Sequence, residues 1–161
     1  MSELFMPDDA TVEIIARAVH DEYLADLPNL DEHHPAHQPW EDLSNVDRER
    51  NRGQVRDNVL KVWSIGLATV TYEPSPASRV DVIPEDDVEQ LAREEHNRWM
   101  ERRSADGYLY GPERNDSPPD RRHPDMVSWG DLPDHTRDKD RNPVRDIPRL
   151  FAAAGLYLVR R

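Results

Sequence analysis

The chain has 161 residues, of which 36% are apolar and 34% charged, with a formal net charge of −12 and no cysteine. This length suits one compact domain, and the lack of cysteine excludes disulfides, thiolate nucleophiles and cysteine metal sites. A strongly acidic chain is repelled by nucleic-acid phosphates and anionic membrane surfaces, so we expect no nucleic-acid or membrane partner. No apolar run approaches the roughly 20 residues of a membrane span, and the N-terminus lacks a secretory pattern. We therefore expect a cytoplasmic protein.

The first predicted element is a helix between Asp8 and Pro28. Its apolar residues recur at helical spacing, and Asp8 and its neighbours Asp9 and Thr11 are suited to cap its N-terminus. Proline cannot continue a helix, so Pro28 ends it.

A cluster of histidines follows this helix. His33, His34 and His37 lie close together, and a histidine pair spaced by four residues can bind zinc on a helix. Pro35 interrupts that spacing, and neither cysteine nor a nearby carboxylate completes a metal pattern. We therefore expect a structural or incidental role, and no metal site.

The next predicted helix is shorter than the first. It is marked by an apolar stripe that ends in Val62 and Trp63, with Gly66 as its stop. A β-prone segment over residues 67–72 comes next, and a Pro/Ser-rich linker, expected to be extended, occupies residues 73–84.

The second half begins with a helix after Pro84. An acidic first turn suits the positive helix N-terminus, apolar residues lead to Trp99 at helical spacing, and Gly107 is the predicted stop. Residues 111–125 are charged and proline-rich, which indicates a mobile or ligand-ordered loop.

The last predicted helix is again shorter than the first helix of its half. Asn142 and Pro143 suit its N-cap and first turn, and Pro148 predicts a kink or a fresh start after Asp146. Gly155 ends it, and a β-prone segment over residues 156–159 follows. We expect this segment to pair with residues 67–72 about a pseudo-twofold axis.

The chain also repeats itself, because residues 34–70 align with residues 123–159 without a gap, at a spacing of 89. Matching blocks are His34-Pro35 with His123-Pro124, Trp40-x-Asp42-Leu43 with Trp129-x-Asp131-Leu132, Val55-Arg56-Asp57 with Val144-Arg145-Asp146, and Gly66-Leu67 with Gly155-Leu156. Upstream, His20-x-x-Tyr23 matches His96-x-x-Trp99 at a spacing of 76. Arg48, Arg52 and Arg56 recur as Arg137, Arg141 and Arg145, either as ordinary surface ion pairs or in a fixed structural role between the repeats.

The residues best suited to bind a ligand are concentrated near Gly107, where Trp99, Tyr108 and Tyr110 lie close in sequence to Arg102 and other arginines. Aromatic faces beside guanidinium groups suit a planar base that carries a phosphate. For Trp99 core packing is favoured over ligand contact, and for the two tyrosines both readings stay open. Glu95-His96 begins like a zinc-protease motif, but position 99 is Trp, and neither a P-loop nor a dinucleotide motif occurs, so we do not expect an enzyme.

These blocks resemble the ryanodine-receptor (RyR) repeat domain, prokaryotic or phage type. The resemblance covers residues 86–161. It is carried by the stretch Leu91-Ala92-Arg93-Glu94-Glu95-His96-Asn97-Arg98-Trp99, then Gly107-Tyr108-Leu109-Tyr110-Gly111-Pro112, His123-Pro124, Trp129-x-x-Leu132-Pro133, Asp140-Arg141 and Gly155-Leu156. It implies a mainly α fold with short strands, in which two repeats are related by a pseudo-twofold axis, and it implies no catalysis. The first half resembles a degenerate copy that lacks the Gly-aromatic-x-Tyr-Gly segment.

We therefore expect a degenerate repeat over residues 1–72, a linker over 73–84 and a second repeat over 85–161, packed as one compact domain. The expected function is non-enzymatic binding of a small anionic, nucleotide-like ligand, without a cofactor. Tyr108 and Tyr110 would stack on it, Arg102 and Arg141 would contact phosphate, and His96 and Trp99 would complete the pocket, with Trp40 or Tyr23 as partners from the first half. The alternative is a protein-interaction module or a homodimer without a small ligand.

Overall fold

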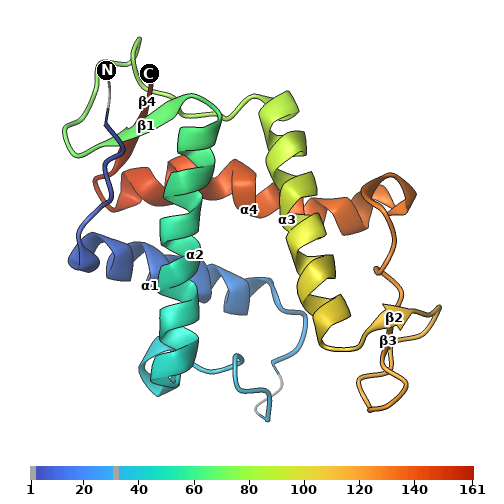
Figure 1. Cartoon of the computed structure of the whole chain (residues 1–161). Helices are drawn as coiled ribbons and strands as arrows, with labels where there is room; N and C mark the ends of the chain where they lie inside the picture. Colours follow the sequence, from blue (N-terminus) through green and yellow to red (C-terminus); the bar gives the residue numbers. More distant parts are fainter. Residues whose placement is uncertain (1–2, 31–32) are drawn as a thin grey trace. The chain divides into compact units, whose positions relative to one another are not determined.

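The computed structural model of the chain describes residues 3–30 and 33–161. Within those residues it is mainly helical, as predicted, with short strands (Figure 1). The helices are α1 (Asp9–Asp26), α2 (Asn45–Ser64), α3 (Glu85–Ala105) and α4 (Asp134–Ala153), with the 3-10 turns η1 (Trp40–Asp42) and η2 (Trp129–Asp131). The strands are β1 (Leu67–Val70), β2 (Leu109–Tyr110), β3 (Arg122–His123) and β4 (Tyr157–Arg160).

The chain divides into two compact units. Unit 1 consists of the residues up to Val82 together with Ile147–Arg161, and unit 2 consists of Ile83–Asp146. Helix α4 therefore contributes its first residues to unit 2 and its last residues to unit 1. The repeat boundaries expected from the sequence stay a prediction.

The first helix of each half begins and ends where local signals place it. The Asp8 side chain accepts a hydrogen bond from the Thr11 backbone N–H at 2.8 Å and caps α1. Helix α3 starts directly after Pro84, and Gly107 follows it with a φ of 87°, a left-handed conformation that favours glycine. Both boundary predictions are confirmed.

The prediction that α2 and α4 are shorter than the first helices is wrong for α2, which spans 20 residues against 18 in α1. Helix α4, with 20 residues, is one residue shorter than α3, with 21. Helix α2 begins at Asn45, where the Ser44 side chain accepts from the Asp47 N–H at 3.1 Å. Helix α4 begins at Asp134 and runs through Pro143 and Pro148 without a fresh start. An interior proline costs a backbone hydrogen bond, and apolar packing on both sides of these prolines offsets that loss, since α4 buries residues before and after Pro148.

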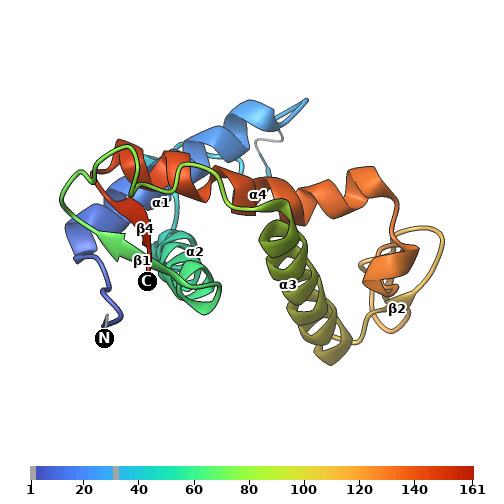
Figure 2. The same cartoon turned by 90° about the horizontal axis from the view of Figure 1, so that it is seen from above.

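Unit 1 is closed by the predicted strand pair. Strands β1 and β4 are antiparallel, with Leu67 opposite Arg160 and Val70 opposite Tyr157 (Figures 1 and 2). Helices α1 and α2 pack on each other, and the core of the unit is buried between them, the strands and the end of α4. Its fully buried side chains include Val12, Ile15, Val55, Val59, Val62, Leu67, Ile147, Phe151, Leu156 and Leu158.

Unit 1 also contains three hydrogen-bonded side chains, those of Glu13, Trp40 and Arg52, which we call the frame of unit 1. The Trp40 indole N–H donates to Glu13 at 3.2 Å, and Arg52 Nε donates to the other oxygen of the same carboxylate at 2.6 Å. The hydrogen bond from Arg52 holds the pKa of Glu13 below its ordinary value. Arg48 donates to the Trp40 carbonyl oxygen at 3.0 Å and so ties α2 to η1.

Unit 2 contains the same frame. The Trp129 indole N–H and Arg141 Nε each donate to Glu89 at 2.7 Å, and Arg137 donates to the Trp129 carbonyl oxygen at 3.0 Å. Trp129 packs with Ala92 and other apolar side chains in the core of the unit. The two frames connect equivalent helices in each unit, so the arginine ladders noted in the sequence have a structural role inside each unit.

Candidate functional site

The first two residues of the candidate site, His96 and Trp99, lie three positions apart on α3 and therefore on the same side of the helix. His96 is buried, and its Nε2 lies 2.8 Å from the Val127 carbonyl oxygen. The His96 and Trp99 rings stack with centroids 5.7 Å apart, and the half-buried Trp99 meets His123 edge to face at 4.9 Å. Burial lowers the pKa of His123 and so favours its neutral imidazole. These contacts place a ring cluster between α3 and β3.

Tyr108 joins this cluster as a buried residue. It is only 7% exposed, and its hydroxyl donates to Asp116 at 2.7 Å. The guanidinium groups of Arg103 and Arg121 lie over its ring, 5.2 and 5.7 Å from the centroid. The hydrogen bond to Asp116 raises the pKa of Tyr108. Ring and hydroxyl are thus already engaged within the protein.

Tyr110 differs, because its side chain is 54% exposed. Strand β2 pairs in parallel with β3, so that Tyr110 lies opposite His123. In the segment that connects these strands, the backbones of Asn115 and Arg122 form two hydrogen bonds with each other, of 2.9 and 2.8 Å. The segment predicted to be a loop therefore has a defined fold, which local sequence patterns did not indicate.

An open hollow of about 540 Å³ lies against Tyr110. Its lining consists of Tyr110, Gly111, Pro112, Glu113, Arg114, Asn115, Asp120 and Arg122. Arg122 donates to Asp120 at 2.8 Å and to the Tyr110 carbonyl oxygen at 3.2 Å. A Cβ at Gly111 would lie 2.8 Å from Arg122 Cβ, so glycine lets the arginine stem cross this position. The hollow thus combines one exposed aromatic ring with two arginines.

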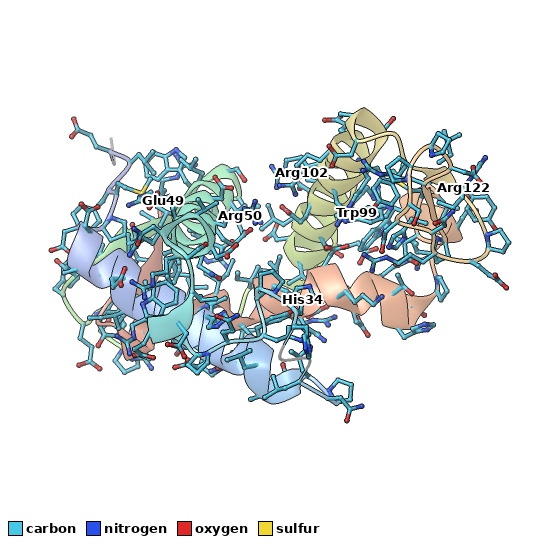
Figure 3. The ribbon with its side chains drawn as sticks, turned by 90° about the horizontal axis from the view of Figure 1, so that it is seen from below. His34, Glu49, Arg50, Trp99, Arg102 and Arg122 are labelled. Carbon is cyan, nitrogen blue, oxygen red and sulfur yellow. The ribbon has the colours of Figure 1, made fainter. Side chains whose placement is uncertain are left out.

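The structure brings some of the predicted site residues together and separates others. His96, Trp99 and Tyr108 belong to the ring cluster, and Tyr110 lines the hollow. In Figure 3, Trp99 lies on the side of α3 toward the 109–123 segment, whereas Arg102 extends from the opposite edge of the helix. Arg102 pairs with Glu95 at 3.5 Å.

Arg141, predicted to contact phosphate, is instead part of the unit 2 frame. Glu89, Asp138 and Asp134 lie 2.7, 3.3 and 3.5 Å from its guanidinium, and only 14% of its side chain is exposed. The hydrogen bond to Glu89 raises its pKa further. Its donors are therefore directed at carboxylates within the unit.

Sequence reasoning missed Arg121, Arg122 and Asp116. They lie in a charged, proline-rich stretch without helical or strand periodicity, which indicated only a loop. The one signal that could have found them is the adjacent arginine pair directly before the repeated His123-Pro124 block.

Two other findings concern metals and membranes. In the described part of the chain, no group of three or more His, Cys, Asp or Glu side chains could hold a metal ion. His34 and His37 stack with ring centroids 4.2 Å apart, and the Tyr23 hydroxyl lies 3.1 Å from His37 Nε2. None of the helices described is long and apolar enough to cross a bilayer.

The chain was compared with known protein families. The family model described as RyR domain matches residues 72–160, which is more than half of the chain. The matched residues contain α3, the ring cluster, the hollow, α4 and β4.

Proposed function

The chain belongs to the RyR domain family, and from this premise we propose that it is a non-enzymatic binding protein for a small, anionic, nucleotide-like ligand. The proposed site is the hollow beside Tyr110. Tyr110 stacks on the base, and Arg114 and Arg122 contact the phosphate. The ring cluster of Trp99 and Tyr108 holds the segment that carries these residues.

The observation that carries the proposal is an exposed aromatic ring beside two guanidinium groups. A planar base stacks on such a ring, and the stacking contributes about 1–3 kcal/mol per base in proteins that bind single strands. Arg122 and Arg114 are 38% and 58% exposed. Their present partners are Asp120 and Asp116, and an exposed pair of this kind stabilises by less than about 1 kcal/mol. A phosphate can therefore replace either carboxylate at low cost.

The local charge also supports this position. The stretch from Arg98 to Arg122 contains six arginines and five carboxylates, whereas the whole chain has a net charge of −12. The stretch therefore carries a formal charge of +1 (six minus five), so it repels an anion less than the chain as a whole does. Arg141 serves the frame in this proposal, not the ligand.

Isothermal titration calorimetry tests the proposal, with nucleoside monophosphates and cyclic nucleotides as ligands and a nucleoside and inorganic phosphate as separate probes. We expect at least one nucleotide to bind with a Kd below about 1 mM, equivalent to about −4 kcal/mol. The nucleoside and the phosphate alone should each bind more weakly, because each engages only one part of the site.

The matched variants are Tyr110→Ala and Tyr72→Ala. Both tyrosines are exposed, but only Tyr110 lines the hollow. Loss of about 1–3 kcal/mol of stacking corresponds to a Kd higher by a factor of about 5 to 150 for Tyr110→Ala. Tyr72→Ala should bind like the wild type. The proposal fails if no nucleotide binds, or if both variants behave alike.

A second candidate function is protein interaction at the same surface. Leu109 precedes Tyr110 and is also exposed, so two consecutive large side chains are available to a protein partner. Leu109→Ser retains the tyrosine and both arginines. It should leave nucleotide affinity unchanged but weaken any protein complex formed through β2, measured by light scattering.

A further inference from the structure

Strand β4 is covered on both edges. On one side it pairs with β1, and on the other Arg79 forms an antiparallel bridge with Val159. The Val80 N–H donates to the Leu158 carbonyl oxygen at 2.8 Å. Arg79 and Val80, followed by Asp81, therefore form the outer edge of the unit 1 sheet.

This outer edge has backbone N–H and C=O groups that are available to pair with another strand. Successive residues of an extended strand point their N–H and C=O groups to opposite sides. Because the Val80 N–H points toward β4, the Asp81 N–H and the Arg79 C=O point away from it. Among the residues that the structure describes, neither group has a hydrogen-bond partner. An open hollow of about 400 Å³ borders the segment, and Val82 is 77% exposed. Such an edge can accept a further strand.

The charges on this edge are self-complementary. Arg79 Nε lies 2.7 Å from Asp81 Oδ1, so both side chains lie on the same face of the segment. Arg79 Nε is buried and has no aligned hydrogen-bond acceptor among the described residues, and Arg79 Nη1 also lies 3.5 Å from Glu73. The side chains of Arg79 and Asp81 are 32% and 58% exposed, so a new partner can reach both charges. Read in the opposite direction, Arg-Val-Asp becomes Asp-Val-Arg, which places opposite charges face to face.

We propose that the edge formed by Arg79, Val80 and Asp81 pairs antiparallel with the same edge of a second copy of the chain, centred on Val80. Each Arg79 then lies opposite the partner's Asp81, and each Asp81 N–H donates to the partner's Arg79 C=O. The contact is isologous, so it closes at two chains. It uses unit 1 alone and is independent of the proposed nucleotide site.

The dimer should be weak and transient. Two backbone hydrogen bonds and two exposed ion pairs form a contact smaller than the roughly 1,200 Å² typical of stable complexes. The two chains also repel each other with a net charge of −12 each. At about 0.15 M salt the Debye length is roughly 8 Å, so distant repulsion is screened while the adjacent Arg79–Asp81 pairs remain effective.

Sedimentation of the whole chain with charge-reversed variants tests this arrangement. The wild-type average mass should rise above 18.7 kDa with concentration. Arg79→Asp and Asp81→Arg should each stay monomeric, because each places like charges opposite one another. An equimolar mixture of the two variants should recover the dimer, since every cross-strand pair is then of opposite charge. A monomeric wild type, or a mixture no more associated than its components, overturns the proposal.

A second test uses the absence of cysteine from the chain. Val80 and its symmetry mate would form a non-hydrogen-bonded pair with Cα atoms about 4.5 Å apart, within disulfide range. Val80→Cys should therefore oxidise rapidly to a covalent dimer. Val82→Cys is more exposed, but its two copies would lie roughly 13 Å apart and should not cross-link in this way. Equal or faster cross-linking of Val82→Cys would refute the register.

Discussion

The frame of unit 2 predicts a specific loss of stability when its carboxylate is removed. Glu89 accepts hydrogen bonds from the Trp129 indole N–H and from Arg141 Nε, both at 2.7 Å. Glu89→Ala removes both acceptors at once. Trp129 is buried, so water does not readily replace the lost partner of its N–H.

The expected loss follows from these contacts. A buried donor without an acceptor costs about 1–3 kcal/mol. Arg141 keeps Asp138 and Asp134 and therefore adds little, and the Glu89 side chain is 36% exposed, so solvent screens part of its charge. We expect Glu89→Ala to destabilise the protein by about 2 kcal/mol, which lowers Tm by about 4–8 °C for a chain of this size.

Urea unfolding followed by tryptophan fluorescence measures this loss. Glu94→Ala is the control, because Glu94 lies on the exposed side of the same helix and, within the described residues, accepts only from Gln90, at 3.2 Å. Glu13→Ala removes the equivalent carboxylate of unit 1, where the bond from Trp40 is longer, at 3.2 Å, so a smaller loss is expected. If Glu89→Ala and Glu94→Ala lose equal stability, the frame is not the cause.

The same carboxylate makes the effect depend on pH. The hydrogen bond from Arg141 holds the pKa of Glu89 below its ordinary value of 4.5. A carboxyl whose pKa is lowered by folding stabilises the folded state fully above its unfolded pKa, and this contribution is lost as the pH falls through the folded pKa. The difference between the wild type and Glu89→Ala should therefore be constant near neutrality and shrink in acid.

Three further predictions concern unit 2. Gly111→Ala should displace Arg122 and weaken nucleotide binding measured by calorimetry. Gly130→Ala is the control and should bind normally, because its Cβ would meet nothing within 4 Å. Equal affinities of the two variants would contradict the role of Gly111. Tyr108 should ionise above the ordinary pKa of 10.0 in an ultraviolet absorbance titration, and Tyr108→Phe should remove this late step and no earlier one. The His123 imidazole should titrate below 6.5 by NMR, and the stability it contributes should be present above 6.5 and lost as the pH falls; a midpoint at or above 6.5 would contradict its burial.

Helix boundaries could be predicted from the sequence where the signal is local. Asp8 and Pro28 bracket α1, and Pro84 and Gly107 bracket α3, because a cap or a proline acts on its immediate neighbours. The start of α4 could not be predicted in this way. Pro143 is a good first-turn residue, but burial of the apolar face of α4 overrides that preference and keeps it inside a longer helix.

The candidate site was predictable only as a neighbourhood. Composition near Gly107 pointed to the correct segment, but Tyr108 and Tyr110 could not be distinguished. Tyr108 is covered because Arg121 approaches it from 13 residues further along the chain, and local periodicity carries no information on such contacts. The partner of Arg141 is Glu89, 52 residues earlier, which no spacing rule specifies.

The division of α4 between the units has a consequence for any shortened version of the gene. A product that starts at residue 83 would retain β4 but lose β1, its antiparallel neighbour, and would expose Leu158, which is buried in the intact chain. A product that ends at residue 82 would lose Phe151 from its core. A cut between residues 82 and 83 therefore separates Phe151, Leu158 and β4 from the helices and the strand that bury them in the intact chain.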